Sequence, residues 1–130
     1  ATRHVEPSGA VRGRSAFLND KPIHVSSTET LQEAVLGIDL GYSDARGKML
    51  LSTIHDLFPG FASVRLMGSG ALGLAYAACG RADIYFHHRL YPWDIASGLL
   101  LVSEAGGVVR GLQSQRGHRP PPDRFLFSPL

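Results

Sequence analysis

The stretch FASVRLMGSGALGLAYAACGRADIYFHH, residues 61–88, decides the fold. Its apolar and β-branched start predicts a strand over residues 61–67. The small and apolar residues after Gly68 predict a helix, and Gly80 is suited to end it because a left-handed glycine often closes a helix. Residues 82–88 then predict a second strand. A strand, a glycine-rich loop, a helix and a strand in this order are typical of a layered α/β domain.

The rest of the chain continues this alternation of strands and helices. We predict a buried strand over residues 33–41 and an amphipathic helix over 43–58, which ends before Pro59 and Gly60. The other predicted elements are a hairpin around Asn19 and Asp20, a helix over 93–107, strands over 108–112 and 125–128, and a polar, proline-rich loop over 113–123. The predicted fold class is therefore α/β, a layered mixed β-sheet with flanking helices, in one domain over residues 1–130.

Composition narrows the classes of protein that the chain can represent. The chain has 130 residues, of which 44% are hydrophobic and 18% charged, as in a globular domain. The net charge is only +2 with no block of Lys or Arg, so nothing indicates nucleic-acid binding, and no apolar run is long enough to cross a bilayer. The single Cys79 excludes an internal disulfide, which favours a reducing compartment, and we expect the cytoplasm.

Three glycines, Gly68, Gly70 and Gly73, match the pattern G-x-G-x-x-G of dinucleotide-binding loops. Such a site also needs an acidic residue at the end of the following strand. Here Asp83 lies at the start of that strand and His87 near its end, so the pattern does not favour a dinucleotide. Two uses remain open: backbone amides at a helix start that bind an anion or a hydroxylated ligand, or small residues that let helix and sheet pack closely.

Asp94 lies in the first turn of the helix predicted over residues 93–107, just after Pro92 and Trp93. A carboxylate at this position is favoured by the helix dipole and can cap the first amides. A carboxylate at a helix start beside a strand end can also bind a hard cation. From the pattern alone, capping and metal binding both remain open.

The segment PWDIASGLLLVSEAGG, residues 92–107, resembles the C-terminal signature of the inositol monophosphatase family. Two upstream segments, GRSAFLNDKPIHVS (13–26) and RLMGSGALGLAYAACGRADIYF (65–86), are similar to further motifs of that family in the same order. The resemblance covers most of residues 12–109. It implies the C-terminal half of an αβαβα sandwich and magnesium-dependent hydrolysis of an inositol phosphate or a related sugar or nucleotide phosphate.

The resemblance also implies roles for individual residues. Asp94 matches a metal-ligating aspartate of the family, which implies Mg²⁺ as cofactor. Gly68, Ser69 and Gly70 match its substrate-contacting loop and would face the alcohol part of the substrate. His87 stands where many members have an acidic residue that holds a substrate hydroxyl. For Arg89 two readings stay open: contact with a second anionic group of the substrate, or an exposed loop cation.

Two elements that supply the family's other metal ligands, an upstream glutamate and an Asp-Pro-Ile/Leu-Asp-Gly-Thr segment, do not occur in this sequence. Asp39, in GIDLG, lacks the proline, first aspartate and threonine of that segment, so we set it aside as a metal ligand. We expect a fragment that carries one side of an active site and is inactive by itself. Its partner would be the missing N-terminal half, and without that half we expect the fragment to self-associate. The alternative is a non-catalytic binding or assembly module derived from this family.

Overall fold

The computed structural model describes residues 8–88, 90–111 and 125–128. Strands β1 (Ser8–Ala10), β2 (Ala16–Leu18) and β3 (Lys21–Ile23) form a three-stranded antiparallel sheet. The turn between β2 and β3 has positive φ at both Asn19 (51°) and Asp20 (61°). Short polar Asn and Asp residues tolerate this conformation, which closes two-residue hairpins, so the predicted hairpin is confirmed.

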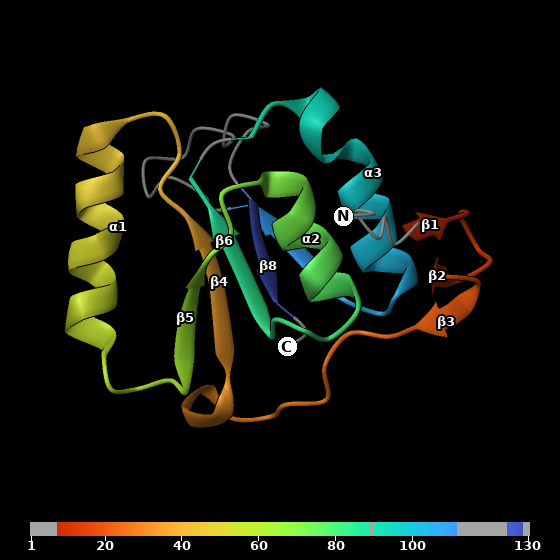
Figure 1. Ribbon diagram of the computed structural model, residues 1–130, viewed down its shortest axis with the longest axis horizontal. Coiled ribbons are helices and arrows are strands. Elements are labelled where there is room, and N and C mark those ends of the chain that lie inside the picture. Colours follow the sequence, from red (N-terminus) through yellow and green to blue (C-terminus); the bar gives the residue numbers. More distant parts are fainter. Residues whose placement is uncertain (1–7, 89, 112–124, 129–130) are drawn as a thin grey trace, which may run out of the picture.

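A second sheet forms the centre of the domain (Figure 1). It contains β4 (Val35–Asp39), β5 (Ser63–Leu66), β6 (Ile84–His87), β7 (Val108–Gly111) and β8 (Phe125–Ser128) in the order β5-β4-β6-β8-β7. β4 is parallel to β5 and β6, whereas β8 is antiparallel to β6 and β7. The predicted mixed sheet is therefore confirmed. The strand predicted over 33–41 is shorter than expected, because the residues Leu31–Glu33 form a 3₁₀ turn, η1.

Three helices connect or flank these strands: α1 (Asp44–Leu57), α2 (Gly70–Ala78) and α3 (Pro92–Glu104). Helix α1 begins after Ser43, whose side chain accepts a hydrogen bond from the Arg46 amide at 3.5 Å. Gly80, with φ of +74°, follows the end of α2 as predicted. None of the described helices is long and apolar enough to span a membrane. The proline-rich loop predicted over 113–123 lies outside the described residues.

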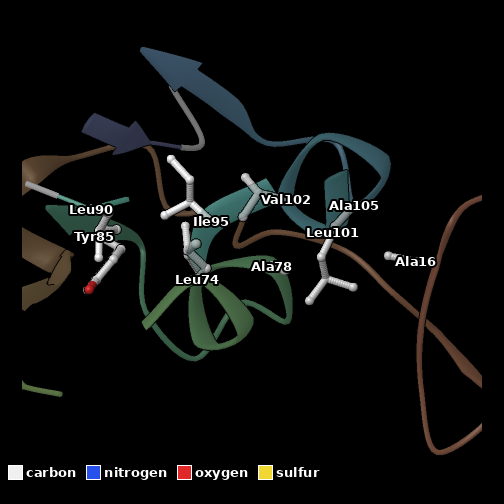
Figure 2. Packing of buried hydrophobic residues seen from close by; sticks show 10 residues of the cluster. Ala16, Leu74, Ala78, Tyr85, Leu90, Ile95, Leu101, Val102 and Ala105 are labelled. Atoms are coloured by element: carbon white, nitrogen blue, oxygen red, sulfur yellow. The ribbon is translucent and has the colours of Figure 1, made fainter. Parts of the chain in front are cut away.

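Side chains that alternate along β4 and β6 form two apolar clusters on opposite faces of the sheet. On one face, Leu36 and Ile38 pack with Leu50 of α1. On the other face, Tyr85 packs with Leu74 of α2 and with side chains of α3, as Figure 2 shows. The connection from β4 to β5 therefore runs over one face and that from β5 to β6 over the other. This change of face places the carboxyl ends of β4 and β6 at a topological switch point, where α/β proteins bind ligands.

Helix α3 is fixed to both neighbouring layers. A Cβ atom on Gly98 would lie 2.3 Å from Leu74 Cδ1, so only glycine allows α3 to approach α2 this closely. At the other end of α3, Glu104 accepts hydrogen bonds from the Gly13 amide at 2.9 Å and the Ser15 amide at 3.4 Å. The glutamate thereby holds the turn between β1 and β2 against the end of the helix. Much of the 92–107 signature consequently has a packing role.

Candidate functional site

A pocket of about 560 Å³ opens at the carboxyl ends of β4, β5 and β6, beside the start of α2. Parallel neighbours bring these three strand ends to one edge of the sheet. Four of the six residues predicted for the site line this pocket. Among the described residues, the lining consists of Asp39, Leu40, Gly41, Tyr42, Leu66, Gly68, Ser69, Gly70, Ala71, His87 and Leu90.

The loop between β5 and α2 forms one wall of the pocket. Gly68 has φ of +69°, a conformation that favours glycine, and Ser69 is the N-cap of α2. The Ser69 hydroxyl accepts a hydrogen bond from the Leu72 amide at 3.3 Å. This bond uses an acceptor position of the hydroxyl, so its hydrogen is left to donate to a ligand. A Cβ atom on Gly70 would lie 2.6 Å from Leu90 Cδ2, so Gly70 serves close packing as well as lining the pocket.

Asp39 lies at the end of β4, and its side chain is 7% exposed. One carboxylate oxygen, Oδ1, accepts a hydrogen bond from the Gly68 amide, and the other, Oδ2, accepts one from the Tyr85 hydroxyl, both at 2.6 Å. Sequence reasoning set this residue aside because it lacks the metal motif. Its position after a buried strand and before a helix was the signal that could have drawn attention to it.

Tyr85 is fully buried beneath the pocket. A Cβ atom on Gly73 would lie 2.2 Å from its Cε2 atom, and one on Gly37 would lie 3.3 Å from its Cδ2 atom. The two glycines therefore make room for the ring, and for Gly73 this agrees with the packing interpretation of the glycine pattern. Burial, followed by the hydrogen bond to Asp39 and its negative charge, raises the pKa of Tyr85. The hydroxyl stays protonated and can donate to Asp39.

His87 ends β6 directly opposite Asp39 in the parallel register of β4 and β6, and it is 5% exposed. Burial lowers the pKa of His87 most strongly; the negative charge of Asp39 acts in the opposite direction, and His88 adds to the lowering. The ring is therefore neutral near pH 7. A neutral imidazole has one nitrogen that donates and one that accepts a hydrogen bond.

Asp94 is the third residue of α3, and its side chain lies outside what the structure describes, as does the whole of Arg89. Their predicted roles therefore stay predictions. The N-cap of α3 is Tyr91, whose ring stacks on that of Trp93 with centroids 4.7 Å apart and an interplanar angle of 5°. Within the described ranges, no three His, Cys, Asp or Glu side chains come together to hold a metal ion. The described residues therefore do not form a complete magnesium site.

The fold and the pocket define an α/β domain with a pocket at the carboxyl ends of its parallel strands, lined by a glycine loop, a serine, a neutral imidazole and a buried carboxylate. Comparison with known proteins then identifies the family of the chain. It belongs to the inositol monophosphatase family, whose model matches residues 6–128. The family and the fold class expected from the sequence motifs are thereby confirmed.

Two curated relatives and one solved structure illustrate the similarity. The chain is 37% identical over 103 residues to the inositol monophosphatase of Dictyostelium discoideum, covering 77% of this chain and 38% of the relative. It is 41% identical over 119 residues to the fructose-1,6-bisphosphatase/inositol-1-monophosphatase of Thermotoga maritima, covering 92% of this chain and 44% of the relative. The structure of inositol monophosphatase from Anabaena (Nostoc) sp. PCC 7120 superposes with a TM-score of 0.79 and 31% identity, covering 97% of this chain and 50% of that one. The chain thus spans half or less of the length of these relatives.

Proposed function

We propose that this chain forms the alcohol-binding side of a magnesium-dependent phosphomonoesterase that acts on an inositol phosphate or a related sugar or nucleotide phosphate. The observation that carries the proposal is that Gly68, Ser69, Gly70 and His87 line one pocket at the carboxyl edge of the sheet. The names of the relatives, inositol monophosphatase and fructose-1,6-bisphosphatase/inositol-1-monophosphatase, support a phosphorylated polyol or sugar as substrate.

The polar groups of the pocket suit the hydroxyls of such an alcohol. The Ser69 hydroxyl can donate a hydrogen bond, and the neutral imidazole of His87 lines the same pocket. The first amides of α2 have no acceptor within the helix, and those before Leu72, whose amide donates to the Ser69 hydroxyl, can donate to a substrate oxygen. These groups would bind and orient the alcohol part of the substrate while its phosphate reacts elsewhere in the cleft.

Asp94 is the residue of this chain that we assign to Mg²⁺, from its match to the family signature and its place in the first turn of α3. Bound magnesium would polarise the phosphate and lower the pKa of an attacking water. One carboxylate cannot supply all the protein oxygens that such a site needs, so the other ligands must come from outside the described residues. Arg89 would meet a second anionic group of the substrate.

The test of this proposal is the variant Asp94→Asn in the protein as its gene encodes it. We expect magnesium-dependent release of phosphate from inositol 1-phosphate to fall by at least 100-fold, whereas the circular dichroism and thermal unfolding should hardly change. The matched control is Asp56→Asn on helix α1, because Asp56 is exposed and pairs only with the neighbouring His55 at 3.3 Å. Retained activity in Asp94→Asn would refute the assignment.

A second candidate function is a non-catalytic binding or assembly module. It is favoured by the histidine at position 87, where many members have an acid. The coding sequence distinguishes the two functions: an upstream Asp-Pro-x-Asp-Gly-Thr segment in the same reading frame would argue against the module. Self-association and a cytoplasmic location stay predictions, which light scattering after size-exclusion chromatography and cell fractionation would check.

A further inference from the structure

One buried carboxylate connects the floor of the pocket to its glycine loop. Asp39 accepts hydrogen bonds from the Gly68 amide and from the Tyr85 hydroxyl, each at 2.6 Å. The first donor belongs to the loop after β5, and the second belongs to β6, the neighbour of β4 on its other side. The side chain therefore joins three adjacent parts of the carboxyl edge of the sheet.

The bond to Gly68 takes the place of a backbone contact. The Met67 amide still donates to the Ile38 carbonyl at 3.1 Å, which extends the pairing of β4 and β5. At Gly68 the chain turns away with φ of +69°, and its amide meets the side chain of Asp39 instead. A Cβ atom at Gly68 would have no heavy atom within 4 Å, so packing around Gly68 does not hold this turn. The hydrogen bond to the carboxylate is the contact that the structure places on this turn.

Tyr85 in turn fixes the carboxylate. Its ring is fully buried and confined by Gly73 and Gly37, so the position of its hydroxyl is set by packing. A charged acceptor makes short, strong hydrogen bonds, and a buried carboxylate is stable only when such donors reach it. The position of the Asp39 carboxylate therefore depends on the packed ring of Tyr85, and the position of the Gly68 amide depends on Asp39. We call this the order of dependence.

We propose that Asp39 is a positioning residue of the site, whose carboxylate holds the Gly68–Gly70 loop in the conformation that presents the Ser69 hydroxyl and the amino end of α2 to the alcohol part of the substrate. Asp39 acts through the loop, because one of its oxygens accepts the hydrogen bond of the Gly68 amide while the other is held by the Tyr85 hydroxyl. The identity of the ligand rests on the proposed function, whereas the role of Asp39 in loop conformation does not.

The structure offers a matched control in Asp83. It is also 7% exposed, and its carboxylate also accepts a backbone hydrogen bond at 2.6 Å, from the Val35 amide. Asp83 lies just before β6, and Val35 begins β4, so this carboxylate sits at the opposite edge of the sheet from the pocket. Loss of either carboxylate lowers stability, but only loss of Asp39 releases the loop.

The experiment compares Asp39→Ala with Asp83→Ala by amide hydrogen exchange in the protein as its gene encodes it. After correction for global stability, exchange at Gly68 should rise roughly tenfold or more in Asp39→Ala, as expected for loss of a hydrogen bond to a charged group. It should stay unchanged in Asp83→Ala, where exchange at Val35 rises instead. In Asp39→Asn the amide side chain can still accept from Gly68 and donate to the Tyr85 oxygen, so most of the protection at Gly68 should return.

Kinetics with inositol 1-phosphate provide the second measurement. We expect KM to rise roughly tenfold in Asp39→Ala with little change in kcat, since loss of uniform substrate binding affects KM alone. KM should not change in Asp83→Ala. If the unmodified protein releases no phosphate, the proposed function fails and hydrogen exchange alone decides the role of Asp39.

Unchanged exchange at Gly68 in a folded Asp39→Ala protein would overturn the inference. If Asp39→Ala does not fold, Tyr85→Phe replaces it, because this change removes only the hydroxyl that holds the carboxylate. Faster exchange at Gly68 in Tyr85→Phe would support the order of dependence, and unchanged exchange there would refute it.

Discussion

Replacement of Gly73 by alanine tests the packing beneath the pocket most directly. The added Cβ atom would lie 2.2 Å from Cε2, 2.4 Å from Cζ and 2.7 Å from Cδ2 of Tyr85. The ring is fully buried and its hydroxyl donates to Asp39 at 2.6 Å, so it cannot move aside without disturbing that bond. Overpacking of a core costs about 1–3 kcal/mol, and a weakened hydrogen bond to a charged group costs about 1.5–3 kcal/mol. The higher helix propensity of alanine returns about 1 kcal/mol.

The expected net loss in free energy of unfolding for Gly73→Ala is therefore about 1.5–5 kcal/mol, measured by urea denaturation followed by circular dichroism. Gly47→Ala is the matched control, because Gly47 is also a buried helical glycine but its nearest contact to an added Cβ is the Leu40 carbonyl oxygen, at 3.4 Å. That change should be neutral or stabilising by up to about 1 kcal/mol. If Gly73→Ala proves as stable as the unmodified protein, the conclusion that α2 packs closely against the Tyr85 ring at Gly73 would be refuted.

Two further changes have defined outcomes. Because burial lowers the pKa of His87 in the folded state, the unfolded state binds more protons at acidic pH, and the free energy of unfolding should fall as the pH drops below the usual range of a histidine. This part of the fall should disappear in His87→Gln, which urea denaturation at about pH 7.5 and about pH 5.5 would measure, and an identical pH dependence in the two proteins would count against a buried neutral ring. Glu104→Ala should lower the free energy of unfolding by about 1 kcal/mol, since it removes both carboxylate oxygens, one of which accepts from the Gly13 amide and the other from the Ser15 amide. Glu104→Gln should lose less, because its single side-chain oxygen can still accept the shorter bond from Gly13; equal losses in the two variants would indicate that the charge matters rather than that hydrogen bond.

Local sequence signals predicted the elements well because each depends on nearby residues. The alternation of strand, glycine loop, helix and strand over residues 61–88 is confirmed, with β5, α2 and β6 inside the predicted limits. Asn19 and Asp20 form the predicted turn, and Gly80 follows the end of α2. The ends of the strand predicted over 33–41 were less accurate, because η1 takes up its first residue and β4 stops at Asp39.

The lining of the pocket was predicted in part. The family signature led to Gly68, Ser69, Gly70 and His87, and all four line the pocket. Asp39 was missed because it was compared only with the metal-binding segment of the family, which the residues around it do not match. Tyr85 was missed because the sequence around a buried aromatic residue does not indicate which distant residue will accept a hydrogen bond from its hydroxyl.

The sequence by itself determined the strands, helices and turns of this chain, and the small residues that a glycine loop and close packing require. These follow from backbone preferences and from apolar periodicity over a few neighbouring positions. Only the tertiary structure decided that Asp39, Gly68 and Tyr85 form one hydrogen-bonded unit beside His87. The bonds of that unit join residues 29 and 46 positions apart. Their meeting depends on the order and register of the parallel strands, because only that register brings the carboxyl ends of β4, β5 and β6 to the same edge of the sheet.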